Sequence, residues 1–127
     1  MSIPSILLVD DEPSHLRLLE AMLRVKDYRL LTATDGYKAL ELCRENPPTL
    51  IFADVHMPDL DGIGFRGLLL EDEALSSIPF IFMSGFWHTK YAVDEVQLNC
   101  DAFLCKPFDA EDLDNVITIA LSSCAVG

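Results

Sequence analysis

Five polar residues stand at the ends of short apolar runs in this sequence, and their side chains could do chemistry together. They are Asp10, Asp11, Asp54, Ser84 and Lys106. Carboxylates that crowd together repel one another, and without compensation at least one of them is pushed toward protonation. Mg²⁺ relieves such crowding, because it commonly binds one or two carboxylates together with waters and phosphate oxygens. The ammonium of Lys106 is a second source of compensation.

One carboxylate of such a set could act as a nucleophile toward phosphorus. Asp54 would attack the phosphorus atom, while a metal ion, the ammonium of Lys106 and the hydroxyl of Ser84 neutralise charge on the equatorial oxygens. Each residue alone also has a plainer interpretation, since aspartates often cap helices and a lone lysine is usually solvated. Their joint placement at consecutive run ends is what favours phosphoryl transfer onto Asp54.

The elements that must position these residues alternate along the chain, apolar runs with amphipathic stretches. The apolar runs predict strands over residues 6–9, 29–33, 50–53, 80–83 and 102–105. Strands that are apolar on both faces and separated by helices indicate an α/β fold with a parallel sheet covered on each side. In such sheets functional groups gather beyond the carboxyl ends of the strands, which is where the polar set lies.

Helical periodicity follows each predicted strand. The predicted helices begin near Pro13, Gly36, Gly62, Thr89 and Asp109. Proline is tolerated in the first turn of a helix, and acidic residues are favoured there by the helix dipole. The periodic pattern is weakest over Thr89–Leu98 and clearest over Leu113–Leu121.

Length and charge limit the possible functions. The 127 residues fit one domain, so we expect residues 1–127 to form a single domain without an effector domain. Half of the chain is apolar, which provides a hydrophobic core. The net charge of −12 comes from 21 acidic and 9 basic residues. A field of that sign repels nucleic acid and anionic membranes, and it favours divalent cations or a basic partner surface.

Cysteine usage and the missing membrane signals indicate a compartment. The cysteines are Cys43, Cys100, Cys105 and Cys124. No two of them have CxxC spacing and three lie in apolar runs, so we expect buried, reduced thiols rather than disulfides or zinc ligands. No apolar run is long enough to cross a bilayer, and no signal peptide is evident. These observations predict a soluble, cytoplasmic protein.

Four motifs around the polar set occur in an order that identifies a family. They are Val9–Glu12, Asp54–Gly62 with its Met-Pro and Asp-Gly pairs, Met83–Gly85, and Lys106-Pro107. In this combination the chain closely resembles the receiver domain of two-component response regulators, from about residue 4 to about residue 122. The resemblance implies a flavodoxin-like (βα)5 fold, a doubly wound parallel sheet of five strands in the order 2-1-3-4-5.

The resemblance also implies a role for each residue of the polar set. Asp54 matches the phosphorylated aspartate. Asp10 and Asp11 match the acidic pair that binds Mg²⁺, with Asp11 as the direct ligand and Asp10 acting mainly through water. Ser84 matches the hydroxyl residue that follows the phosphoryl group. Lys106 matches the lysine that pairs with a phosphoryl oxygen.

Further positions match residues that surround this set in the family. The backbone carbonyl of His56 matches a main-chain metal ligand, and the Lys106-Pro107 bond resembles the family's cis peptide. Phe103 matches the aromatic residue that swings inward when the hydroxyl of Ser84 is drawn to the phosphate. For Phe86 two interpretations stay open: it shields the acyl phosphate from water, or it packs on the next helix.

The implied function is phosphorelay signalling. With Mg²⁺ or Mn²⁺ as cofactor, Asp54 would accept a phosphoryl group from a sensor histidine kinase or a histidine phosphotransfer protein. The surface of the fourth helix, fifth strand and fifth helix would then change and act on a downstream protein. Such a protein catalyses its own phosphorylation and autodephosphorylation, and it is not an enzyme that turns over an outside substrate. No direct contact with nucleic acid or membrane is expected.

Two other functions are compatible with parts of the pattern. A receiver-fold scaffold could bind a protein partner without being phosphorylated. A Mg²⁺-dependent phosphatase with an aspartyl nucleophile is disfavoured, because such enzymes place two aspartates around one intervening residue on a first strand. Three histidines are present, His15, His56 and His88, and none has metal-ligand spacing. We expect His15 on the exposed side of the first helix, either solvated or contributing to kinase docking.

Overall fold

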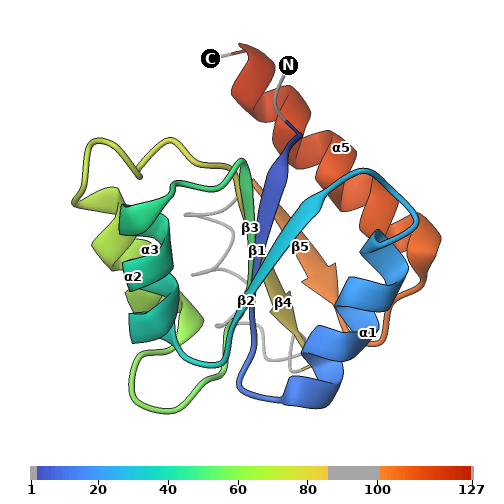
Figure 1. The fold of residues 1–127 in the computed structure, drawn as a ribbon, viewed down its shortest axis with the longest axis horizontal. Helices are drawn as coiled ribbons and strands as arrows, with labels where there is room; N and C mark the ends of the chain where they lie inside the picture. Colours follow the sequence, from blue (N-terminus) through green and yellow to red (C-terminus); the bar gives the residue numbers. More distant parts are fainter. Residues whose placement is uncertain (1–2, 86–100, 127) are drawn as a thin grey trace.

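Five short strands form one parallel sheet in the computed structural model, which describes residues 3–85 and 101–126. The strands are β1 (Ser5–Val9), β2 (Arg29–Ala33), β3 (Leu50–Asp54), β4 (Phe80–Ser84) and β5 (Ala102–Cys105). Their order in the sheet is β2-β1-β3-β4-β5, and every neighbouring pair is parallel (Figure 1). The predicted strands and their order are confirmed.

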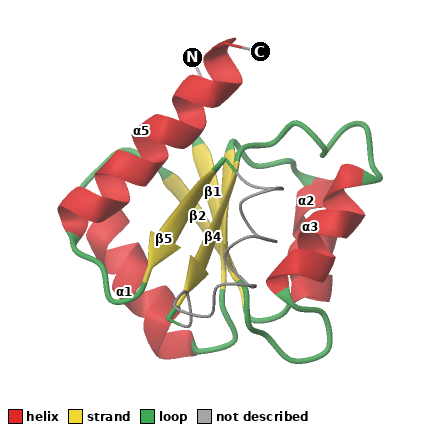
Figure 2. Cartoon of the chain, turned by 180° about the vertical axis from the view of Figure 1, so that it is seen from behind, coloured by secondary structure: helices red, strands yellow, loops and turns green. Residues whose placement is uncertain are grey.

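Helices cover both faces of this sheet. Helices α1 (Pro13–Leu23) and α5 (Ala110–Val126) lie on one side, and α2 (Gly36–Glu45) and α3 (Gly62–Leu70) lie on the other (Figures 1 and 2). The helix predicted over Thr89–Leu98 lies outside the described residues, as does Phe86. In the part of the chain that the structure describes, no helix has the length and apolar character needed to span a membrane.

The sheet separates two hydrophobic clusters, because side chains alternate along each strand. On β1, Leu7 and Val9 belong to the cluster under α2 and α3, whereas Ile6 and Leu8 belong to the cluster under α1 and α5. All five residues of β3 and all five of β4 are buried, as expected of central strands in a sheet covered on both sides. The acceptor candidate at the end of β3 is thus carried by the most enclosed part of the fold.

The helices begin where local side-chain chemistry lets them begin. Pro13 is the first residue of α1, where its missing N–H leaves no bond unmade. The side chain of Asp35 accepts a hydrogen bond from Lys38 N at 2.8 Å and caps α2, and that of Asp61 accepts from Gly64 N at 2.7 Å and caps α3. The start of α1 at Pro13 and the cap of α3 at Asp61 bound the loops after β1 and β3, and these two loops carry part of the candidate site.

Candidate functional site

Backbone pairing continues just past the strand ends and holds the polar residues in place. Asp10 follows β1, and its N–H donates to Ala33 O at 3.1 Å, one step beyond the paired strands. Lys106 follows β5, and its N–H donates to Ser84 O at 3.1 Å. Asp54 is the last residue of β3 and pairs with Met83 of β4. Asp10, Asp54 and Lys106 are therefore placed by the sheet itself.

Alternation along the strands explains why three of these side chains meet. Asp54 lies two positions after Phe52, and Lys106 lies two positions after Leu104, so both continue rows that pack under α1 and α5. Asp10 continues the row of Leu8 in the same way. Residues two apart on a strand share a face. The acidic and basic groups are thereby brought to one side of the sheet edge, beside α1.

Lys106 bridges the two aspartates. Its Nζ donates to Asp10 Oδ2 at 2.7 Å and to Asp54 Oδ2 at 2.8 Å. The side chain of Lys106 is 17% exposed and that of Asp10 is fully buried, so the contacts form in a poorly solvated place. The other oxygen of Asp54, Oδ1, accepts a hydrogen bond from His56 N at 3.0 Å. Both oxygens of the acceptor candidate are therefore oriented.

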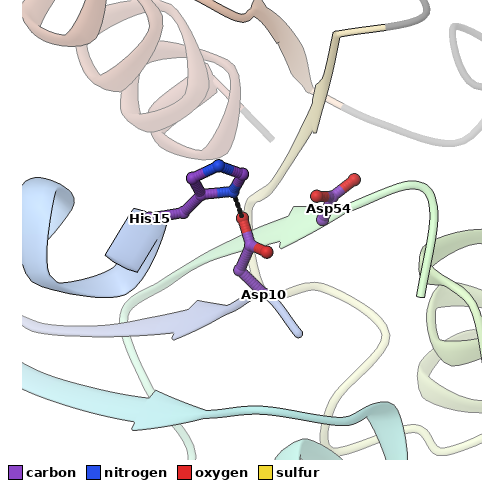
Figure 3. Close-up of side chains that lie close together, drawn as sticks. All are labelled: Asp10, His15 and Asp54. Atoms are coloured by element: carbon purple, nitrogen blue, oxygen red, sulfur yellow. Dashed lines mark hydrogen bonds and ion pairs between the residues drawn. The ribbon is translucent and has the colours of Figure 1, made fainter. Parts of the chain in front are cut away.

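His15 joins this group, which sequence interpretation missed. Its Nδ1 lies 3.1 Å from Asp10 Oδ2 and 3.0 Å from Lys106 Nζ. Figure 3 shows the ring reaching from α1 toward Asp10, with Asp54 beside them. The side chain is 44% exposed, as expected for the exposed side of the helix, but the expectation of a merely solvated histidine is wrong, because Nδ1 contacts Asp10 and Lys106. The helix starts at Pro13, two residues after Asp11, and this closeness to the acidic pair was the available signal.

The titration of Asp54 and Lys106 reflects their shared surroundings. Burial raises the pKa of Asp54, and the nearby charge of Asp10 raises it further, while hydrogen bonds from Lys106 and His56 oppose the rise. Burial of Lys106 lowers the pKa of its ammonium, but the hydrogen bonds to Asp10 and Asp54 outweigh this and raise it overall. Both directions follow from an excess of negative charge in a place with little water.

A depression at this edge holds the groups that suit a divalent cation. It measures about 240 Å³ and is lined by Asp11, Glu12, His15, Asp54, His56, Gly85 and Lys106. Asp11 and Asp54 supply carboxylates. The single positive charge of Lys106 does not balance their two negative charges and that of the buried Asp10. Oxygen donors and uncompensated negative charge are what Mg²⁺ requires, so the residues present fit this ion.

Asp10 is not among the residues that line this depression. It is fully buried; its Oδ1 accepts from Glu12 N at 2.9 Å, and its Oδ2 faces Lys106 and His15. Donor atoms of Asp10, His15 and Asp54 all lie within 4.8 Å of one another. The two members of the predicted acidic pair thus occupy different surroundings, one buried and engaged, the other open to the depression.

Ser84 and Phe103 lie near the other face of the sheet. Ser84 ends β4, is 3% exposed, and has the parity of Phe80 and Phe82, which belong to the cluster under α2 and α3. Phe103 is partly buried against the same cluster. Because Ser84 pairs with Cys105 in the neighbouring strand, Phe103 lies two residues before the partner of Ser84. The two residues therefore share a face of adjacent strands.

One peptide bond and two cysteines can be compared with what the sequence predicts for them. The Lys106-Pro107 bond is cis, as the resemblance implied. Cys43 is a buried free thiol, as expected, whereas Cys105 is free but exposed, so the expectation of burial is wrong for Cys105. Cys105 ends β5, an edge strand whose last residue faces away from Leu104 and toward solvent.

An apolar groove adjoins the depression. It has a volume of about 380 Å³ and is lined by His15, Leu18, Leu19, Lys106, Pro107 and Phe108. Leu18 is 53% exposed, a large apolar side chain left open to water. His15 and Lys106 line both the groove and the depression. A partner that fills the groove would therefore touch the edge of the acidic site.

Comparison with known proteins gives a consistent result. Residues 6–118 match the family model described as response regulator receiver domain. The chain is 34% identical to response regulator Rre1 of Synechocystis sp. over 114 residues, covering 89% of this chain and 49% of that protein. It is 36% identical to the transcriptional regulatory protein ZraR of Escherichia coli, covering 92% of this chain and 26% of that protein. The chain thus spans half or less of the length of these relatives.

Solved structures agree with the sequence matches. The signal receiver domain of an HD domain-containing protein from Pseudomonas fluorescens has a TM-score of 0.88 and 25% identity, with 99% of this chain and 100% of that chain covered. The receiver domain of sensor histidine kinase PA1611 from Pseudomonas aeruginosa has a TM-score of 0.87 and 26% identity, with 95% and 99% covered. That structure has a magnesium ion coordinated in its active-site cleft.

Proposed function

The chain belongs to the response regulator receiver domain family, and from this premise we propose that Asp54 accepts a phosphoryl group from the phosphohistidine of a partner protein. The observation that supports this most is the placement of Asp54: buried at the end of a central strand, with Lys106 on one carboxylate oxygen and His56 N on the other. A nucleophile held at both oxygens meets an incoming phosphorus atom in a fixed orientation.

The proposed transfer uses groups that the chain supplies. A carboxylate oxygen of Asp54 forms a bond to phosphorus, while the bond from phosphorus to the donor's imidazole nitrogen breaks and its electron pair leaves with that nitrogen. Negative charge then lies on the phosphoryl oxygens beyond Asp54. Lys106 already stands 2.8 Å from the carboxylate and pairs with one of these oxygens as they arrive.

A divalent metal completes the proposed site. Asp11, Asp54 and the backbone carbonyl of His56 would hold Mg²⁺, or Mn²⁺, directly, and Asp10 would support it mainly through water. This assignment is supported by Asp11, Asp54 and His56 lining one depression, and by Asp10 lying buried with its oxygens engaged. When bound, the ion supplies positive charge to the phosphoryl oxygens. The same charge would lower the repulsion among the carboxylates.

The output of the reaction is proposed to be a change of surface. Ser84 moves toward the phosphoryl group, and Phe103 fills the space that Ser84 leaves. Their shared face on adjacent strands supports this coupling. The surface of β5 and α5, together with the helix predicted over residues 89–98, would then present a different shape to a downstream protein, as a population shift between two packings.

The apolar groove suits the phosphodonor. A sensor histidine kinase or a histidine phosphotransfer protein would seat apolar side chains on Leu18 and Phe108 and so direct its phosphohistidine into the depression. Exposed apolar surface beside a polar reactive group is typical of such a contact.

We place this exchange in the cytoplasm, with residues 1–127 acting as one receiver domain. This domain catalyses its own phosphorylation and dephosphorylation, without turnover of an outside substrate.

Incubation with acetyl phosphate and Mg²⁺ tests the proposal. The expected result is one base-labile phosphoryl group on wild-type protein, lost in Asp54→Asn and retained in the exposed control Glu41→Gln. Modification that survives Asp54→Asn would refute Asp54 as the acceptor. Lack of modification in the wild type would favour a scaffold that only binds a partner, and repeated turnover of added phosphoesters would favour a phosphatase.

A further inference from the structure

We propose that His15 is a positioning residue for Lys106, accepting the third N–H of its ammonium group through Nδ1. A protonated lysine has three N–H donors and no acceptor. Around Nζ stand three acceptor atoms: Asp10 Oδ2 at 2.7 Å, Asp54 Oδ2 at 2.8 Å and His15 Nδ1 at 3.0 Å. With His15 included, every donor of Lys106 has a partner.

This contact fixes the tautomer of His15. Because the ammonium has no lone pair to offer, Nδ1 must face it with its own lone pair, and the ring proton lies on Nε2. The distance of 3.1 Å between Nδ1 and Asp10 Oδ2 is then a contact of two acceptors that share one lysine. The opposite arrangement, Nδ1–H donating to Asp10, would leave the third N–H of the ammonium without His15 as its acceptor and would place a second positively polarised proton beside the ammonium, whose Nζ lies 3.0 Å from Nδ1.

Helix α1 holds His15 rigidly enough for this role. His15 N donates to Glu12 O at 3.0 Å in the first turn, and the neighbouring Leu16 and Leu19 are buried. The described donors Asp10, His15 and Asp54 could also surround a metal ion. Lys106 already stands among them, with His15 Nδ1 3.0 Å from its Nζ, so we assign His15 to the lysine rather than to a metal ion.

The effect of the His15–Lys106 contact on phosphoryl transfer rests on the proposed phosphorylation of Asp54. Phosphorylation moves the negative charge of Asp54 out to the phosphoryl oxygens, whereas Asp10 and His15 are chemically unchanged. Asp10 and His15 therefore continue to accept hydrogen bonds from the ammonium, while its remaining N–H donates to a phosphoryl oxygen instead of to Asp54. Without His15 only Asp10 would hold Lys106 during the transfer.

NMR of the unphosphorylated protein, without metal or phosphodonor, tests the contact itself. In the neutral imidazole, we expect His15 to have an unprotonated Nδ1 and a proton on Nε2. We expect the Lys106 ammonium protons to exchange with water about fivefold faster in His15→Leu, the size expected for one partly exposed hydrogen bond to a charged group. His15→Asn, whose Oδ1 stands near the position of Nδ1, should restore slow exchange.

Lys106→Met provides the matched control for the tautomer. Once the ammonium is gone, Nδ1 is expected to gain a proton and to donate to Asp10. A proton on Nδ1 in the wild type would overturn the proposal, as would Lys106 exchange that is unchanged in His15→Leu. The wild type and His15→Asn keep the test decisive even if the leucine variant does not fold.

Phosphorylation by acetyl phosphate measures the consequence, and this small donor avoids any effect on partner docking. We expect His15→Leu to be phosphorylated about fivefold more slowly than the wild type and His15→Asn to recover most of the rate. Equal rates for the leucine variant and the wild type would overturn the role in transfer. If the wild type is not phosphorylated at all, the proposed function fails, whereas the NMR result still decides the contact.

Discussion

At the residue scale, Asp54 is held in a state that favours reaction over stability. Burial raises its pKa, so the carboxylate is harder to ionise there than in water. At neutral pH the charged form is kept by Lys106 and His56 N. A buried charge of this kind commonly marks a functional position at which stability has been given up.

Asp54→Asn is therefore expected to stabilise the metal-free protein by about 1 kcal/mol at pH 7. A folded-state pKa above the ordinary 3.8 means that the native protein binds this proton more tightly than the unfolded chain. The corresponding stability is fully present below pH 3.8 and is lost as pH rises through the folded value. The gain from asparagine should thus be seen at pH 7 and shrink toward pH 4, in urea unfolding at both pH values.

The raised pKa of Lys106 does not disturb this comparison. Its contribution is fully present below the ordinary value of 10.5 and is lost only as pH rises through the folded value, so it is constant between pH 4 and 7. Glu41→Gln, at an exposed position, should change the free energy of unfolding by less than about 0.5 kcal/mol. An asparagine variant with equal gains at both pH values would contradict the argument.

How much of the site could be predicted is also a matter of single residues. Asp10, Asp54 and Lys106 were predicted to converge because each ends a recognisable apolar run, and the structure brings them into contact. The contacts of His15 were not predicted, because helical spacing distinguishes only a buried face of the helix from an exposed face. Its partner Lys106 comes from a distant part of the chain, and helical periodicity carries no information about such a neighbour.

At the element scale, helix α3 is pressed against the end of β3. Gly62 N donates to Val55 O at 3.0 Å, and a Cβ at Gly62 would lie 2.3 Å from Asp54 O. A side chain there would meet backbone, which cannot turn aside as a flexible side chain can. The first turn of α3 is therefore part of what places Asp54.

Gly62→Ala should destabilise the protein by about 2 to 3 kcal/mol, because α3 must move away from β3. Gly67 on the same helix is the matched control, since a Cβ there would meet nothing within 4 Å. Gly67→Ala should stabilise by up to about 1 kcal/mol, because alanine is the better helix former. Urea unfolding measures both, and a similar effect at the two positions would contradict the close approach.

A second prediction at this scale concerns the groove between α1 and the loop after β5. Leu18→Asp places a charge on the exposed apolar wall, so transfer from a phosphohistidine protein should fall about tenfold or more, as for a lost apolar anchor. Phosphorylation by acetyl phosphate, which needs no docking, should stay within about twofold of the wild type. The exposed Val25, outside this groove, provides the control Val25→Asp.

A loss of acetyl phosphate reactivity in Leu18→Asp would show that the variant damages the site instead of the docking surface. Equal transfer from the protein donor in Leu18→Asp and the wild type would contradict the role of the groove. Both donors must therefore be compared on the same preparation of each variant.

Element boundaries were predictable because their signals are local. Pro13 starts α1, Asp35 and Asp61 cap the next two helices, and the apolar runs of β3 and β4 are buried throughout. The order of the strands came from family resemblance, since it depends on pairing between distant segments. Exposure at Cys105 was missed because an apolar run does not show which of its residues ends an edge strand.

At the scale of the whole molecule, the net charge of −12 makes the folded chain repel itself, and its carboxyl edge concentrates part of that charge. Any salt should screen the general repulsion and stabilise the fold. A divalent ion bound at one site adds a second effect, because a ligand that binds only the native state stabilises it by mass action. The two effects can be separated by their dependence on Asp11.

MgCl₂ should therefore raise the free energy of unfolding more than NaCl of equal ionic strength. At a Mg²⁺ concentration about 100 times its dissociation constant the extra gain is about 2.7 kcal/mol. Asp11→Asn removes a carboxylate of the depression and should keep the gain from NaCl while losing most of the extra gain from MgCl₂. Urea unfolding in each salt measures this. If Asp11→Asn gained as much from MgCl₂ as the wild type, the ion would be acting on the charge of the whole molecule and the proposed metal site would be wrong.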